Sequence, residues 1–199
     1  MTPRPAHEDA WAPWPPAELA HRLQGVRAWW SVVGGWALDL WHGNPTRPHD
    51  DLECATGPDG LAEITACLSD LTFFAARQGR LVHHPSGAAP AGAHQFWGLD
   101  PAVGRWRVDV MLEPGTAAQW VCRRDPSIRM PRSQIVHRDG AGVPYLAPEA
   151  VLLFKAKHRH PKDEADFDRA LARMEVHRKQ RLARWLELVH PGHDWRHRL

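Results

Sequence analysis

Two adjoining stretches, GGWALDLWHG at residues 34–43 and TRPHDDLE at residues 46–53, decide the fold of this chain. The glycine pair of the first stretch follows a short β-branched run and opens a segment that predicts a helix. The second stretch leads into a predicted strand at residues 51–55. Because side chains at positions i and i+2 of a strand point to the same face, we expect Asp51 and Glu53 to converge on one spot.

A pair of neighbouring carboxylates is a costly arrangement unless something neutralises it. Two such groups repel each other, and one of them tends to keep its proton. A divalent cation removes this penalty and uses both groups as oxygen ligands. A glycine turn at a helix start, beside the strand with Asp51 and Glu53, is a way to hold a metal-bound triphosphate. The structural alternative is a solvated strand end paired with Arg47.

A third carboxylate, Asp109, lies in the middle of the predicted strand at residues 106–112, where a lone aspartate is disfavoured. If this strand lies beside residues 51–55, Asp109 joins the carboxylate pair. Three carboxylates and phosphate oxygens together can hold one or two Mg²⁺ ions. Pairing of Asp109 with Arg105 or Arg107 is the structural alternative.

The composition is that of an ordinary globular protein. Of the 199 residues 43% are hydrophobic and 24% charged, and the formal net charge is +2. Without a concentrated basic run, we do not expect a nucleic-acid partner. No apolar run is long enough to span a membrane, and the N-terminus lacks an apolar leader. The three cysteines predict reduced, mostly buried thiols, so we expect a cytoplasmic protein.

The pattern along the chain predicts an α+β fold, with a mixed β-sheet flanked by helices and a small C-terminal helical lobe. We expect a loose arm at residues 1–15 within a first domain at residues 1–145, and the helical lobe at residues 146–199. The expected strands are 29–33, 51–55, 71–76, 80–84, 94–99 and 106–112, with a hairpin at 134–145 turning at Asp139-Gly140. The expected helices are 17–23, 35–42, about twelve residues from 61, 147–158, 162–174 and 179–188.

The order GG…DxE…D, with a strand and a helix before the acidic strand, resembles the nucleotidyltransferase superfamily that includes DNA polymerase β. More narrowly, residues 34–40, Thr46-Arg47 and residues 49–53 resemble the aminoglycoside 2″-adenylyltransferase-like group. Residues 142–167, which include Lys155, look like the helical segment of related small nucleotidyltransferases.

This resemblance implies a five-stranded mixed sheet in a nucleotidyltransferase catalytic domain, followed by the helical lobe. It also implies Mg²⁺-dependent transfer of a nucleoside monophosphate, AMP from ATP, to a hydroxyl of a small molecule such as an aminoglycoside-like acceptor. Asp51 and Glu53 would hold Mg²⁺. Asp109 would hold a second ion or accept the proton of the attacking hydroxyl.

The resemblance also implies which residues contact the nucleotide. These are Gly34, Gly35, Trp36, Arg47, His49 and Lys155. Trp36 stands where the wider superfamily often has serine, and Glu53 stands where it often has aspartate. From the residues alone, Arg47 pairs with Asp50 or reaches a phosphate. Lys155 lies on a solvated helix face or points into the cleft, where it would offset triphosphate charge.

Other interpretations remain at this stage. The chain is alternatively a catalytically silent or antitoxin-type relative that acts through a protein partner, and its oligomeric state is a monomer or a homodimer. The fourteen histidines show no pattern of four convergent zinc ligands, which leaves the role of the His-rich C-terminus open. An aminoglycoside site would be acidic, with Glu113, Asp139 and Glu149 as candidate contributors.

Overall fold

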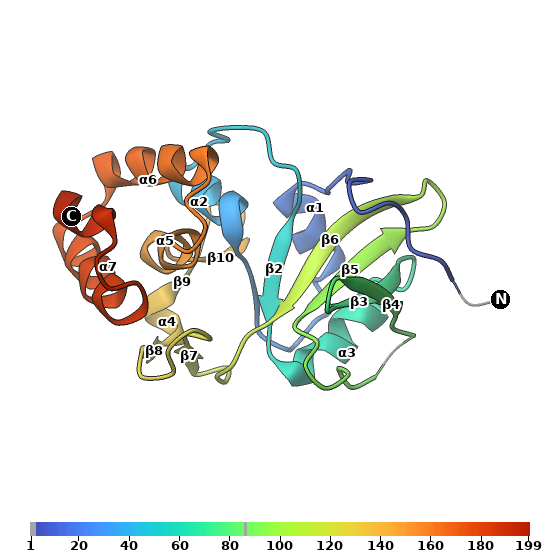
Figure 1. Cartoon of the computed structure of the whole chain (residues 1–199). Coiled ribbons are helices and arrows are strands. Elements are labelled where there is room, and N and C mark those ends of the chain that lie inside the picture. The colour runs from blue at the N-terminus through green and yellow to red at the C-terminus, as the bar shows by residue number, and fades with distance from the viewer. Residues whose placement is uncertain (1–2, 86) are drawn as a thin grey trace.

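The computed structural model describes residues 3–85 and 87–199. Its main sheet has eight strands in the order β4-β3-β5-β6-β2-β1-β10-β9, and β7 and β8 form a separate pair (Figure 1). The strands are β1 (Trp30–Val32), β2 (Glu53–Thr56), β3 (Thr72–Arg77), β4 (Arg80–His83), β5 (Gln95–Asp100), β6 (Arg105–Leu112), β7 (Gln119–Val121), β8 (Arg129–Pro131), β9 (Val136–Arg138) and β10 (Pro144–Leu146). The helices are α1 (Pro16–Arg22), α2 (Gly34–His42), α3 (Pro58–Cys67), α4 (Arg132–Ile135), α5 (Pro148–Lys155), α6 (Pro161–Arg173), α7 (Val176–Val189) and the 3₁₀ helix η1 (Asp194–Arg198).

The acidic strands are neighbours, which is the condition under which Asp109 joins the carboxylate pair. β2 runs parallel to β6, and Glu53 lies opposite Asp109 in the register. Val108 and Val110 of β6 are fully buried, so this strand lies in the core of the sheet. The sheet thus brings two of the three carboxylates to adjacent positions on one face.

Helix α2 begins and ends at glycines with left-handed backbone conformations. Gly34 has φ +64° and Gly43 has φ +80°. The N–H of Gly43 donates to the carbonyl of Asp39 at 2.9 Å, so the helix ends where the sequence predicted. No side chain caps the start of α2 among the described residues. Its first N–H groups are therefore available to a ligand.

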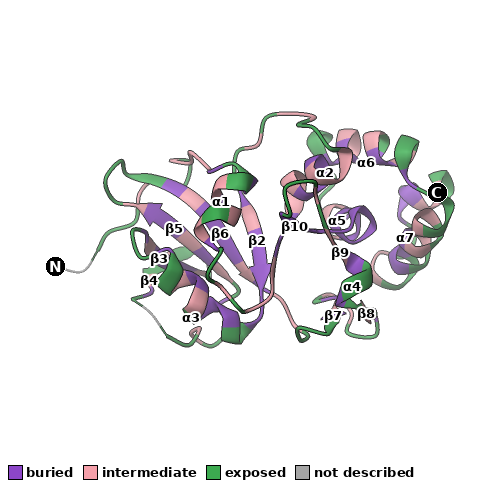
Figure 2. Cartoon of the chain, turned by 180° about the vertical axis from the view of Figure 1, so that it is seen from behind, coloured by how far each residue is buried: buried purple, intermediate pink, exposed green. Residues whose placement is uncertain are grey.

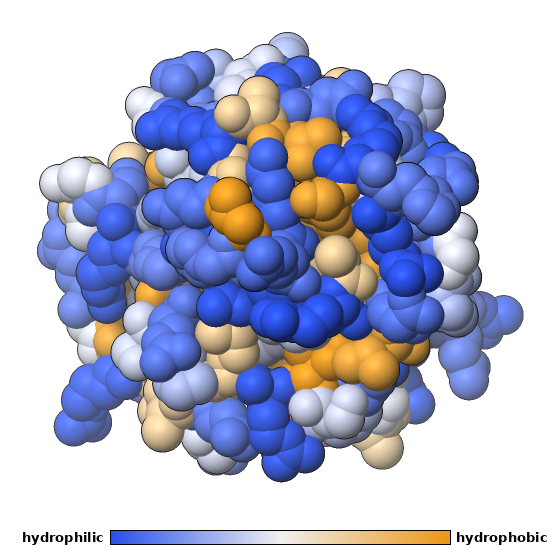
Figure 3. Space-filling model, turned by 90° about the vertical axis from the view of Figure 1, so that its left-hand side faces the viewer, coloured by the Kyte–Doolittle hydropathy of each residue, from blue (hydrophilic) through white to orange (hydrophobic). Residues whose placement is uncertain are grey.

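The C-terminal helices assemble around α5. In Figure 2 this helix is buried in the middle, with α6 and α7 beside it and α2 above. Glu149, in the first turn of α5, is fully buried, and its carboxylate accepts hydrogen bonds from Arg178 and Arg181 of α7. Figure 3 shows that hydrophilic residues cover most of the outer face of this lobe.

Two expectations about the fold were wrong, and one strand pair was not predicted. The main sheet has eight strands rather than the five that the resemblance implies, and these eight match the six strands and the hairpin expected from the pattern along the chain. The β7–β8 pair was not predicted, since its strands have only three residues each. Strand β2 begins at Glu53, so Asp51 precedes the strand instead of lying within it.

The N-terminal segment is not a loose arm over its described part. The N–H of Ala12 donates to the carbonyl of Trp106 at 3.0 Å, and the N–H of Trp106 donates to the carbonyl of Ala10 at 2.9 Å. The ring of Trp11 packs edge-on against Trp97, with centroids 5.2 Å apart. Aromatic burial accounts for this docking. The first two residues of the expected arm lie outside the described residues.

Two further sequence expectations concern the domain boundary and the cysteines. The expected boundary after residue 145 falls inside β10, and the division into two domains stays a prediction. Cys54 and Cys122 are buried and Cys67 is exposed, so most of these thiols are buried as predicted. Within residues 3–85 and 87–199, no helix has both the length and the apolar character that crossing a membrane requires.

Candidate active site

A cavity of about 380 Å³ lies between the start of α2, the ends of β2 and β6, and the helices α5 and α6. This volume suits a ligand of nucleotide size. Six of the predicted site residues line it: Gly34, Gly35, Arg47, Asp51, Glu53 and Lys155. The other three, Trp36, His49 and Asp109, do not line it.

The carboxylate of Glu53 lies directly against the glycine turn. A methyl group placed on Gly34 would overlap the carboxylate, whose Cδ lies 3.1 Å from the position of that methyl carbon. A negative charge at a helix N-terminus is favourable. Even so, burial and the charges of Asp51 and Asp109 raise the pKa of Glu53 to about 8. This clustering of acidic groups calls for a cation.

Asp109 is a buried carboxyl with one unsatisfied oxygen. Its side chain is only 4% exposed, and Oδ2 accepts a hydrogen bond from Gln95 Nε2 at 2.8 Å. Oδ1 has no partner among the described residues. Burial raises the pKa of Asp109 to about 7, although the Gln95 bond opposes the shift. Arg107 binds Asp100 instead, so the expected alternative of an Asp109–Arg107 pair was wrong.

These carboxylates fit Mg²⁺ by donor chemistry. They offer hard oxygen atoms, which this ion prefers, and the unpartnered oxygen of Asp109 is suited to a ligand role. Within the described part of the chain, no three His, Cys, Asp or Glu side chains lie close enough together to hold an ion unaided. Phosphate oxygens or water would complete the coordination, as is usual for Mg²⁺.

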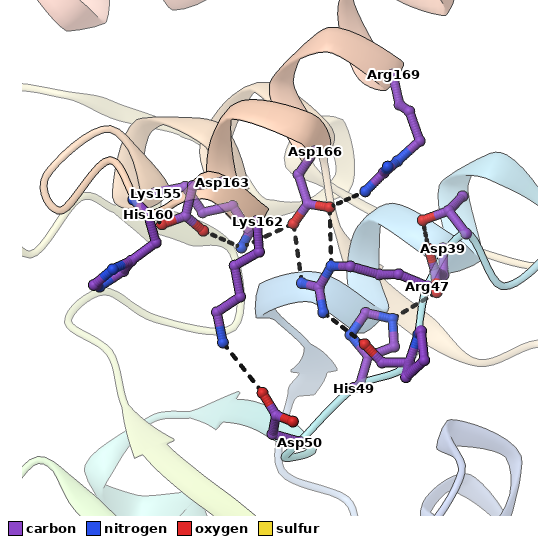
Figure 4. A network of polar contacts seen from close by, with 12 residues as sticks. Asp39, Arg47, His49, Asp50, Lys155, His160, Lys162, Asp163, Asp166 and Arg169 are labelled. Carbon is purple, nitrogen blue, oxygen red and sulfur yellow. Dashed lines mark hydrogen bonds and ion pairs between the residues drawn. The ribbon is translucent and has the colours of Figure 1, made fainter.

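Arg47 and Lys155 share the buried carboxylate of Asp166 (Figure 4). Arg47 donates to both Asp166 oxygens at 3.0 Å, and Lys155 Nζ lies 3.0 Å from Asp166 and 2.7 Å from Asp163. Burial opposes ionisation of Asp166, but Arg47 and Lys155 outweigh it and lower the pKa to about 2. Both cations are therefore fixed at the cavity wall. The alternative partner of Arg47, Asp50, is contacted by Lys162 instead.

Trp36 and His49 lie beside the glycine turn, outside the cavity lining. Their rings stack with centroids 4.4 Å apart, and His49 Nε2 lies 2.6 Å from Asp39 Oδ2. A methyl group on Gly35 would meet the His49 ring at 2.7 Å. The His49 side chain is only 3% exposed. The His49 ring therefore packs against the turn, and direct contacts of Trp36 and His49 with a nucleotide stay predictions.

Sequence reasoning missed several residues of the cavity. Gln95, which binds Asp109, lies on β5 beside β6, and a polar residue at that strand position was the available signal. Arg123 and Arg124 line the cavity from the connection between β7 and β8. Their adjacency in sequence was visible, but nothing local related them to the carboxylates.

The three acidic candidates for an aminoglycoside site do not gather. Only Glu113 lines the cavity. Asp139 accepts hydrogen bonds from the backbone of Ala141 and Val143 in the β9–β10 turn. Glu149 is bound by the two arginines of α7 described above. Of the three candidates only Glu113 therefore contributes to the cavity, where Asp51, Glu53 and Asp163 are the other acidic residues of the lining.

Comparison with a family model of aminoglycoside-2″-adenylyltransferases gives a match over residues 17–91. The matched segment contains the glycine turn and the first two carboxylates, and it ends before Asp109. Curated protein sequences gave no match.

Solved structures show the same fold. The crystal structure of ANT(2″)-Ia in complex with adenylyl-2″-tobramycin aligns with a TM-score of 0.60 and 14% identity, over 85% of this chain and 94% of that one. The lincomycin-bound lincosamide antibiotic adenylyltransferase LnuA aligns with a TM-score of 0.52 and 13% identity, over 75% and 89%. The chain thus has a nucleotidyltransferase fold, which confirms the predicted class. Within that class it resembles the aminoglycoside 2″-adenylyltransferase group.

Proposed function

We propose that this chain transfers AMP from Mg²⁺-bound ATP to a hydroxyl of a small molecule, with pyrophosphate as the leaving group. One observation carries the proposal. The uncapped glycine turn of α2 and the carboxylates of Asp51 and Glu53 face the same cavity, with Asp109 in register beside Glu53. The family match and the shared fold support nucleotidyl transfer as the class of reaction.

The glycine turn is suited to phosphate binding. The first N–H groups of α2, at Gly34 and Gly35, have no capping side chain and would donate to phosphate oxygens. Arg47 and Lys155, fixed by Asp166, would offset negative charge on the phosphates. A close approach is possible because neither glycine carries a side chain.

The carboxylates divide into ion ligands and a proton acceptor. Asp51 and Glu53 would hold Mg²⁺, which when bound neutralises phosphate charge and aligns the reacting oxygens. Asp109 has a free oxygen and a pKa of about 7, so near neutral pH it can accept the proton of the acceptor hydroxyl or serve as a further ligand.

The test is transfer of label from α-³²P-ATP to a panel of hydroxyl compounds, including an aminoglycoside, in the presence of Mg²⁺. Asp51→Asn should reduce transfer by about 100-fold or more. Asp59→Asn, an exposed isosteric change on α3 away from the cavity, should leave it unchanged.

Two results would contradict the proposal. The first is the absence of both ATP·Mg²⁺ binding and transfer. The second is full activity of Asp51→Asn. Tight ATP·Mg²⁺ binding without transfer to any acceptor would favour the silent relative that acts through a protein partner.

A further inference from the structure

Three cations on the cavity wall lack a carboxylate partner. Arg123 and Lys157 are exposed, and neither forms a hydrogen bond or ion pair with another described residue. Arg124 is half-buried and lies over the ring of Phe154 at 5.0 Å. Its Nη1 donates to the carbonyl of Leu153 at 2.9 Å and lies 3.2 Å from His190 Nε2, so none of its described partners is a carboxylate.

Such an arrangement is unfavourable without an anion. A partly buried guanidinium loses hydration, and hydrogen bonds to a carboxylate or a phosphate compensate this loss best. Burial lowers the pKa of Arg124, and the neighbouring charge of Arg123 lowers it further. Glu113 also lines the cavity, but burial raises its pKa to about 7 despite Arg132 and Arg123. Near neutral pH it compensates these cations only partly.

The three cations are separate from the phosphate-binding turn. Arg123 and Arg124 follow β7, and Lys157 follows α5, whereas the turn opens α2. In both Figure 1 and Figure 2 the β7–β8 pair lies on the opposite side of α5 from α2. Arg123 and Arg124 therefore lie away from the turn. His190 relates Lys157 to them, because Arg124 lies 3.2 Å from His190 and burial, Arg124 and Lys157 all lower the pKa of this histidine. Asp51 and Glu53 belong with the cations at α2.

We propose that Arg123, Arg124 and Lys157 form a second anion subsite, which binds a phosphate or carboxylate group of the acceptor. This inference rests on the proposed function and adds the chemical class of the acceptor, a hydroxyl compound with a negative charge. The subsite also repels polycations, since six cationic side chains line the cavity against four acidic ones. Two of those acids, Asp51 and Glu53, are the proposed ion ligands.

The experiment is calorimetric titration of the full chain with inorganic phosphate, glucose 6-phosphate and tobramycin. Each titration is done with and without a saturating non-hydrolysable ATP analogue and Mg²⁺. The test variant is the double charge reversal Arg123→Glu/Lys157→Glu, which leaves the backbone contact of Arg124 intact. The control is Arg77→Glu/Arg184→Glu, two exposed cations outside the cavity lining.

We expect both phosphates to bind the wild-type chain with the ATP analogue present, and at least tenfold more weakly to the test variant. The control should bind them like wild type. The subsite is refuted if the ATP analogue excludes phosphate, because the cations then serve ATP itself. It is also refuted if phosphate does not bind, if the test variant binds it normally, or if tobramycin binds better than glucose 6-phosphate. One further result would separate the two proposals. If the chain does not bind ATP, but phosphate binds the wild-type chain and not the test variant, the proposed function is refuted and the subsite is supported.

Discussion

The contact between Gly34 and Glu53 makes Gly34→Ala a sharp test of the site. Gly34 has φ +64°, a conformation that costs an alanine about 1–2 kcal/mol. The new methyl group would also overlap the carboxylate of Glu53, which must then move away from the start of α2. For a chain of 199 residues, each kcal/mol lowers Tm by about 2–4 °C, so the backbone effect corresponds to a fall of about 2–8 °C.

Gly43→Ala is the matched control, because it separates the backbone cost from the displaced carboxylate. Gly43 ends the same helix with φ +80°, and a methyl group there meets nothing within 4 Å. We expect both variants to show a similar fall in Tm by circular dichroism. Only Gly34→Ala should also weaken ATP·Mg²⁺ binding and label transfer, by at least about tenfold, which corresponds to 1.4 kcal/mol.

The reasoning is refuted if Gly34→Ala keeps wild-type binding and transfer while its Tm falls. In that case the position of the Glu53 carboxylate does not matter for the ligand. Equal losses of transfer in the two variants would also refute it, because the loss would then follow from the backbone of α2 alone.

Two further predictions concern charge. The pKa values of about 8 for Glu53 and about 7 for Asp109 exceed those of an unfolded chain, so the stability they contribute is present in acid and lost as pH rises through 7–8. The Tm without Mg²⁺ should fall between pH 6 and pH 9. Mg²⁺ with an ATP analogue should raise the Tm more at pH 9 than at pH 6. An effect of Mg²⁺ on Tm that does not change with pH would contradict this. Asp166→Asn leaves Arg47 and Lys155 buried without their shared carboxylate. Urea unfolding should therefore show that the free energy of unfolding falls by about 3–5 kcal/mol. An unchanged midpoint of unfolding would show that the network contributes little.

Local patterns in the sequence were enough to predict the acidic strands. Asp109 was an aspartate among apolar residues, and the structure pairs it with Glu53 across two parallel strands. The helix from the glycine pair to Gly43 was equally visible, since glycine has a specific role at each end. These features depend on interactions within a few residues or on one strand pairing.

The remaining contacts join residues that are distant in sequence. Arg47 and Asp166 are 119 residues apart, and no periodicity relates them. The docking of the segment around Trp11 onto β6 depends on apolar rings that a Pro- and Ala-rich stretch does not reveal. Long-range partners of this kind are selected by packing of the whole chain, which a single sequence does not display.

The length of Glu53 adds a steric reason for a glycine at position 34 to the one that the positive φ already gives, and the two positions can be tested as a pair. Glutamate is one methylene longer than the aspartate that the wider superfamily often has here, and its carboxylate reaches the start of α2. Glu53→Asp withdraws that carboxylate, so it should make room for a methyl group at position 34. In a double-mutant cycle, Gly34→Ala/Glu53→Asp should therefore recover part of the ATP·Mg²⁺ binding lost in Gly34→Ala, although the backbone cost in Tm remains. Strictly additive losses of binding would show that the two residues do not act through this contact.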